Sequence, residues 1–177
     1  MGQKFDTIFR FCPLCGDRSG PTSSIPFVCN NCEFQYYFSP TIAVGGIICD
    51  EAGRVLFIER AKDPGKGMLG LPGGFVDGGE SGEIAVAREI HEEVGLIATE
   101  MQFLTTFPNT YEYKGVISDV LDLFYVCKVK TIEFIQVQES EVTSYFFAKP
   151  EESVIEQMAF ESNKKAIRKF AGLKENG

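Results

Sequence analysis

Residues 74–96 of the chain read GFVDGGESGEIAVAREIHEEVGL, and no other stretch says more about the fold and the function. The stretch opens with a glycine-rich turn and continues with apolar residues at helical spacing. Ser81 is a suitable N-cap, Glu83 fits the first turn of a helix, and Gly95 is the kind of residue that follows a helix end. The pattern predicts a helix over residues 82–94, which is about three and a half turns.

Three carboxylates lie close together on this predicted helix. Glu89, Glu92 and Glu93 fall within an arc of about 100°. Like charges on one face repel one another, and this costs stability unless a cation neutralises them. Hard divalent ions with oxygen ligands, Mg²⁺ or Mn²⁺, are the expected partners. For the helix taken alone, a solvated acidic face without a metal is the alternative.

The complete spacing is more specific than the helix. It reads G-x5-E-x7-R-E-U-x-E-E-x-G-U, where U is a bulky aliphatic residue, and is filled here by Gly74, Glu80, Arg88, Glu89, Ile90, Glu92, Glu93, Gly95 and Leu96. This pattern resembles the signature of the Nudix hydrolases, which cleave nucleoside diphosphates linked to another group. The resemblance covers residues 41 to about 170 and implies an α+β fold, an α/β/α sandwich around a mixed sheet.

The resemblance also implies roles for these residues. In Nudix enzymes the helix of the motif holds the catalytic metal ions, and a backbone carbonyl near its first glycine commonly joins them. Glu89, Glu92, Glu93 and the carbonyl of Gly73 would then bind Mg²⁺ or Mn²⁺ ions, which bridge the diphosphate and polarise water for attack on phosphorus. Glu80 would belong to the preceding loop and reach a metal through water.

Other charged residues near the motif have two interpretations each. Arg88 could pair with the glutamates and orient them, which we favour, or it could touch the substrate. A further acid outside the motif often serves as ligand or base in this family. Glu141 and Glu139 are the candidates, with plain surface charge as the alternative. His91, the only histidine, occupies an unrestricted position and is better explained as structural or solvent-facing.

Candidates for substrate contact flank the motif. Arg60, Lys62 and Lys66 precede it, where they could meet a phosphate, although surface cations are the simpler explanation for the lysines. Phe107 and Tyr111 follow it in the segment FPNTYEYKG, which has the composition of a loop. An aromatic ring there could stack on a base or pack as a lid over the core.

Four of the six cysteines form two CxxC pairs with 13 residues between them: Cys12, Cys15, Cys29 and Cys32. This spacing is typical of a closed tetrahedral zinc site. Two disulfides are the alternative, but the N-terminal residues MGQKFDTIFRFC lack a signal peptide, so we expect a reducing, cytoplasmic location. We therefore predict a small Cys₄ zinc ribbon over residues 1–40, with a structural role, and a Nudix domain over residues 41–177.

A ribbon followed by a Nudix domain resembles the NADH pyrophosphatase and ADP-ribose pyrophosphatase branch of the family. The chain departs from that branch because it has no tryptophan and lacks an SQPWPFP-like segment after the motif. The resemblance thus implies cleavage of a nucleoside diphosphate derivative such as ADP-ribose or NADH. The alternatives are a MutT-like hydrolase of nucleoside triphosphates and a nucleic-acid-binding or sensor protein that uses the ribbon. An RNA-cap hydrolase would combine the cleavage of a nucleoside diphosphate derivative with nucleic-acid binding.

Composition limits the partners. The net charge of −8 argues against long-range attraction to nucleic acid. No apolar run reaches the roughly 18 residues that span a bilayer, so a membrane partner is not expected. The ribbon and the N-terminal segment could support a homodimer.

Outside the motif, the pattern of β-formers and turn residues predicts the remaining elements. We expect a β-hairpin from strands 41–49 and 54–59, a loop at 62–67, strands at 99–107, 118–129 and 142–147, and a helix within 151–170.

Overall fold

The computed structural model of the chain describes residues 2–18 and 25–175. By their contacts, these residues form two compact units. The first runs up to Thr41 and also includes Thr110–Val120, and the second consists of Ile42–Asn109 and the chain from Leu121 onward. The domain boundary between residues 40 and 41 stays a prediction.

The first unit is built from short elements around a small core. It contains β1 (Gln3–Lys4), α1 (Phe5–Ile8), β2 (Phe27–Val28) and β3 (Gln35–Tyr36), in addition to the segment from residue 110 to 120. Strands β2 and β3 pair antiparallel, and β1 pairs parallel with β8 through Gln3↔Val116 and Lys4↔Ile117. The buried residues of its core are Cys12, Phe27 and Cys29.

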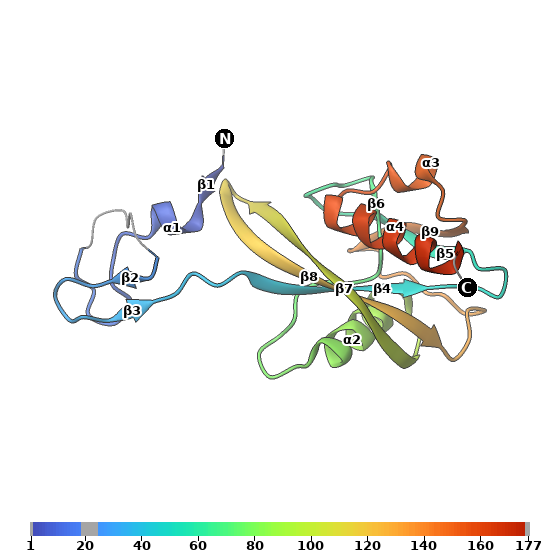
Figure 1. The fold of residues 1–177 in the computed structure, drawn as a ribbon, viewed down its shortest axis with the longest axis horizontal. Coiled ribbons are helices and arrows are strands. Elements are labelled where there is room, and N and C mark those ends of the chain that lie inside the picture. Colours follow the sequence, from blue (N-terminus) through green and yellow to red (C-terminus); the bar gives the residue numbers. More distant parts are fainter. Residues whose placement is uncertain (1, 19–24, 176–177) are drawn as a thin grey trace. The chain divides into compact units, whose positions relative to one another are not determined.

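The second unit holds most of the regular structure (Figure 1). Its elements are β4 (Thr41–Ile48), β5 (Val55–Arg60), β6 (Leu69–Gly70), α2 (Gly82–Val94), β7 (Ala98–Tyr113), β8 (Val116–Val129), β9 (Val142–Ala148), α3 (Glu152–Ile155) and α4 (Glu161–Glu175), with the first residue of β4 and the joined ends of β7 and β8 belonging to the first unit. One sheet brings β8 together with β4 and β7, and the other has the order β6-β5-β9.

Alternation along the strands gives each sheet two apolar faces. On one face Leu56 and Tyr125 are packed in a cluster with the buried residues of α2. On the other face Phe57 and Phe124 are packed with Ile167 of α4. Helices α2 and α4 lie on opposite sides of the strands in Figure 1. The predicted α/β/α sandwich is confirmed.

The ends of α2 are those that the sequence predicts. The Ser81 hydroxyl accepts a hydrogen bond from the Ile84 N–H at 3.3 Å. At the other end Gly95 adopts φ 70°, in the left-handed region that favours glycine, and its N–H donates to the His91 carbonyl. Helix α2 therefore spans residues 82–94, as expected.

The hairpin predicted from residues 41–49 and 54–59 is wrong. Strands β4 and β5 lie in different sheets and share a single bridge, Cys49↔Val55. Asp50 closes the turn by accepting the Arg54 N–H at 2.8 Å, and β5 then pairs along its length with β9. The predicted turn therefore forms, but β5 takes its extended pairing from a strand distant in sequence.

Two further expectations are corrected. Residues 107–113 are not a loop, because β7 continues through them as the partner of β8. The C-terminal helix is split into α3 and α4, with a non-helical segment between them. Two residues of that segment, Gln157 and Ala159, bond to Leu69 of β6. The Leu69 N–H donates to the Gln157 carbonyl, and the Ala159 N–H donates to the Leu69 carbonyl. These strand-like bonds take the backbone groups that a continuous helix would need.

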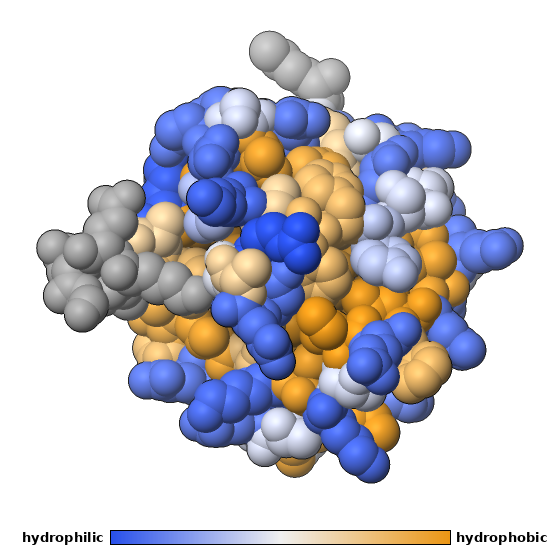
Figure 2. All heavy atoms as spheres, turned by 90° about the vertical axis from the view of Figure 1, so that its right-hand side faces the viewer, coloured by the Kyte–Doolittle hydropathy of each residue, from blue (hydrophilic) through white to orange (hydrophobic). Residues whose placement is uncertain are grey.

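The surface mixes polar and apolar groups. On the face drawn in Figure 2, apolar side chains reach the surface between hydrophilic ones, as is usual because polar groups cannot cover a whole protein. Among the described residues, no helix is both long enough and apolar enough to cross a membrane.

Replacing Ser81 with alanine tests the N-cap of α2. The change removes the acceptor for the Ile84 N–H, so we expect the free energy of unfolding to fall by about 1 kcal/mol. Urea unfolding at unchanged slope measures the difference. Ser81→Asp keeps an acceptor and should stay close to wild type. An alanine variant as stable as wild type would show that Ser81 does not cap the helix.

Candidate active site

The loop before α2 runs close to the neighbouring backbone and side chains. A Cβ at Gly73 would lie 2.1 Å from the Val44 carbonyl oxygen, and one at Gly74 would lie 2.6 Å from an oxygen of Glu89. The loop is fixed to β4, because the Val44 N–H donates to the Gly74 carbonyl at 2.8 Å. Gly73 is needed here so that the loop can run against the backbone of β4, and Gly74 leaves room for the carboxylate of Glu89.

Arg88 ties this loop to the helix. Its guanidinium donates two hydrogen bonds to Glu80, at 2.8 and 2.9 Å, and a third to the Phe75 carbonyl at 3.0 Å. The hydrogen bonds from Arg88 lower the pKa of Glu80 below its usual value. Glu80 is therefore held as an anion at the edge of the loop.

The same guanidinium reaches the acids of α2. It donates to Glu89 at 2.7 Å and to Glu92 at 3.1 Å. Burial raises the pKa of Glu89, and the nearby Arg88 partly offsets this effect. Arg88 thus contacts three of the predicted metal-binding carboxylates, which is the geometry that an orienting role requires.

Glu93 has a different environment. Its side chain lies on the buried face of α2 and is 9% exposed, and one oxygen accepts the Gly73 N–H at 2.9 Å. Burial raises the pKa of Glu93 to about 8; the charge of Arg60 counteracts this, and the charges of Glu89 and Glu141 add to it. A buried carboxylate with negative neighbours is costly to ionise without a cation.

Glu141 and Arg60 join the site from the ends of β9 and β5. These strands are paired, with an irregularity between Glu59 and Arg60. Glu141 forms an ion pair with Lys62, a contact that no pattern in the sequence predicts. Arg60 donates to the Pro64 carbonyl at 3.0 Å and lies 4.9 Å from the ring centre of Phe160.

The remaining predicted residues are less closely associated with these acids. His91, Glu139 and Lys66 are exposed. Phe107 is half-buried and packs near Phe124, with ring centres 6.4 Å apart, whereas Tyr111 belongs to the first unit. The substrate roles of Phe107 and Tyr111 stay predictions.

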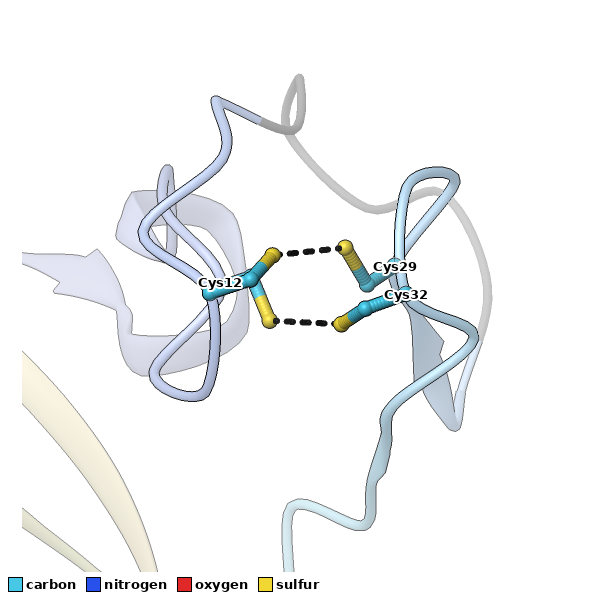
Figure 3. A group of neighbouring side chains, drawn as sticks. Cys12, Cys29 and Cys32 are labelled. Carbon is cyan, nitrogen blue, oxygen red and sulfur yellow. Dashed lines mark hydrogen bonds between the residues drawn. The ribbon is translucent and has the colours of Figure 1, made fainter.

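The cysteines of the two CxxC pairs come together in the first unit. Their four sulfur atoms all lie within 4.8 Å of one another. Figure 3 shows sulfurs of Cys12, Cys29 and Cys32 pointing toward a common centre. The Cys12–Cys32 and Cys15–Cys29 sulfur pairs are each 3.6 Å apart, longer than the roughly 2.05 Å of a disulfide. The cluster fits a zinc ribbon.

One thiol of this cluster is poised to ionise. The backbone N–H of Cys32 donates to Cys29 and lowers the pKa of Cys29 to about 7. Thiolates rather than thiols bind metals. The donor type, number and spacing therefore agree with a tetrahedral sulfur site.

Within the described chain, the carboxylates of α2 do not form an equally close cluster. Arg88 draws Glu89 and Glu92 to one side, and Glu93 is turned toward the Gly73 N–H. Their oxygens are nevertheless the ligand type that Mg²⁺ and Mn²⁺ prefer.

The α/β/α sandwich with this acidic helix is that of a known family. The family model described as NUDIX domain matches residues 39–170, and the chain belongs to the Nudix family. The ADP-ribose pyrophosphatase of Methanocaldococcus jannaschii is 49% identical over 65 residues, which cover 37% of this chain and 38% of that protein.

Two other similar proteins cover more of the chain. The NAD-capped RNA hydrolase NudC of Haemophilus influenzae is 25% identical over 146 residues, covering 80% of this chain and 54% of that protein. The crystal structure of a NUDIX hydrolase from Nitrosomonas europaea superposes with a TM-score of 0.70 at 22% identity, covering 95% of this chain and 93% of that one. The chain thus spans about half or less of the two curated relatives, and the structural match supports the fold.

The pH dependence of stability tests the burial of Glu93. Its pKa rises from 4.5 to about 8 in the folded protein. The folded state therefore holds this proton more tightly, so the stabilisation from the neutral acid is present below about pH 4.5 and is lost as the pH rises through about 8. We expect wild type, freed of divalent cations on a chelating resin, to lose stability over this range relative to Glu93→Gln.

Thermal unfolding at a series of pH values measures this difference. Glutamine keeps an acceptor for the Gly73 N–H, so the variant isolates the charge. Glu92→Gln, at an exposed position of the same helix, should follow wild type. Parallel stability curves for wild type and Glu93→Gln would contradict the costly ionisation of Glu93.

Proposed function

We propose that the chain hydrolyses the diphosphate bond of a nucleoside diphosphate linked to another group, with ADP-ribose and NADH as the leading substrates. The observation that carries this proposal is the acidic set on and before α2, in which Arg88 holds Glu80 and Glu89 while Glu93 is buried against the Gly73 N–H. An acidic patch with only a surface role would not need a buried carboxylate.

The donor set fits a hard divalent cation. Glu89, Glu92, Glu93 and the Gly73 carbonyl offer oxygen ligands, and Glu80 would contribute through water. Burial, with the nearby charge of Glu89, raises the pKa of Glu93, and a bound cation would stabilise its ionised form. Bound Mg²⁺ or Mn²⁺ would neutralise charge on the diphosphate and lower the pKa of water.

The chain's own residues then have distinct tasks. Arg88 fixes the directions of Glu80 and Glu89, and the Gly73 N–H fixes Glu93. A water oxygen forms the new bond to phosphorus, the bridging P–O bond breaks, and the bridging oxygen leaves with the other phosphate. Glu141 would accept the water proton, and Arg60 would offer positive charge to a phosphate.

The names of the relatives support this substrate class and also the MutT-like alternative, since a MutT-like protein is among them. One is named an ADP-ribose pyrophosphatase and another an NAD-capped RNA hydrolase, and both names describe a diphosphate with a nucleoside on one side. The name NAD-capped RNA hydrolase also supports the RNA-cap alternative. Against that alternative, the net charge of −8 offers no general attraction to RNA.

A product-resolved hydrolysis screen with Mg²⁺ tests the proposal. The panel holds ADP-ribose, NADH, diadenosine polyphosphates, sugar nucleotides and nucleoside triphosphates. We expect cleavage of a nucleoside diphosphate derivative and a loss of at least about a hundredfold in Glu93→Gln. Glu133→Gln, an exposed position in the same unit, is the matched control and should keep wild-type activity. Preference for triphosphates would favour the MutT-like reading, and an active Glu93→Gln would remove Glu93 from the site.

We also propose that Cys12, Cys15, Cys29 and Cys32 hold one structural zinc ion. Such a site is closed, so it would stabilise the first unit and take no part in hydrolysis. A homodimer and a cytoplasmic location stay predictions.

Metal content tests the zinc site. Elemental analysis of the purified chain should give about one zinc per chain, because the four thiolates are already close together. Cys29→Ser should lose zinc and lower the melting temperature. Cys49→Ser, outside the cluster, should keep both. Full zinc content in Cys29→Ser would overturn the assignment.

A further inference from the structure

A cavity of about 340 Å³ lies within the first unit, apart from the residues of the Nudix motif. Its walls come from the start of the chain, from Ile25, from residues 36–41 and from β8. The parallel pairing of β1 with β8, Lys4↔Ile117, joins two of these walls. The volume is within the range of about 300–1,000 Å³ found for small-molecule sites.

Aromatic rings form the apolar part of the wall. Tyr36 and Phe38 both line the cavity, and their ring centres are 5.2 Å apart in an edge-to-face arrangement. Phe9 stacks on Tyr36 with ring centres 5.5 Å apart and meets Phe38 edge-on at 5.2 Å. The rings are therefore held in place by packing, which suits them to bind a flat ligand by stacking.

The polar part of the wall carries more acidic than basic groups. Asp6 and Asp119 bring two carboxylates to the cavity, and Lys4 brings one ammonium group. Ionised carboxylates only accept hydrogen bonds, so they suit a ligand with N–H or O–H donors. Ser118, Ser39 and Thr41 add hydroxyls that can both donate and accept. A flat, uncharged ring with an amino group and attached hydroxyls matches this lining; a phosphate does not.

We propose that this cavity is an accessory site for a purine nucleoside that carries an exocyclic amino group, as adenosine does. The ring would stack on the Tyr36–Phe38 wall, its amino group would donate to Asp119, and the ribose hydroxyls would meet the hydroxyl side chains. The choice of a nucleoside among flat amines rests on the proposed function, since nucleoside derivatives are the compounds that this chain would handle.

The test uses the full zinc-loaded chain labelled with ¹⁵N and titrated with adenosine. We expect saturable shifts of the amides at residues 4–6, 36–41 and 117–119. Asp119→Ala should weaken binding about tenfold, the usual loss for a hydrogen bond to a charged group. Phe38→Leu, checked for unchanged zinc content, should weaken it as well. Inorganic phosphate should leave these amides unmoved.

Two controls separate the site from other effects. Asp17→Ala removes the same charge from an exposed position of the same unit outside the cavity, and it should bind adenosine as wild type does. Glu93→Gln should also bind normally. Shifts confined to residues 73–93, or equal affinity in wild type and Asp119→Ala, would overturn the proposal.

The same samples distinguish this inference from the proposed function. If adenosine binds at residues 117–119 but no nucleoside diphosphate derivative is cleaved, the accessory site stands and the proposed function fails. If cleavage occurs and these amides do not respond to adenosine, the accessory site fails and the proposed function stands.

Discussion

The arrangement of the acids depends on the guanidinium of Arg88. It bridges the loop before α2 and the helix itself, through Glu80 and the Phe75 carbonyl on one side and Glu89 and Glu92 on the other. Without it, the glutamates would repel one another and the loop would lose its ties to the helix through Glu80 and the Phe75 carbonyl. One cation thus fixes both the backbone of the loop and the directions of the carboxylates. The bidentate contact to Glu80 also explains why lysine, with a single charged nitrogen, would be a poor substitute.

Burial divides the glutamates of α2 into two kinds. Glu92 is exposed beside Arg88, whereas Glu93 is enclosed on the same face as the apolar residues that pack on the sheet. A carboxylate in that position reduces the stability of the metal-free protein at neutral pH, because its ionisation is opposed by burial. Such a cost is typical of functional sites, where a group is held ready for a ligand that is absent from the free protein.

The parts of the fold that local chemistry determines could be predicted from the sequence. Ser81 and Gly95 define the ends of α2 through their own hydrogen bonds and backbone angles, and the paired CxxC spacing brings four sulfurs together. Two of the errors concern pairings between distant segments. Strand β5 pairs with β9 rather than β4, and Leu69 of β6 interrupts the C-terminal helix. Neither partner is visible from a local pattern, and the same holds for the ion pair of Lys62 with Glu141.

An acidic chain that acts on an anionic diphosphate needs local attraction. With a net charge of −8, the long-range field of the protein would repel such a substrate. The end of β5 opposes this, because the positive charge of Arg60 acts within electrostatic range of Glu93. Divalent cations bound by the glutamates would add positive charge at the same place. The proposed catalysis therefore depends on positive local potential within a negatively charged protein. The cavity of the first unit has more carboxylates than ammonium groups. Its walls therefore suit the uncharged base rather than the phosphates.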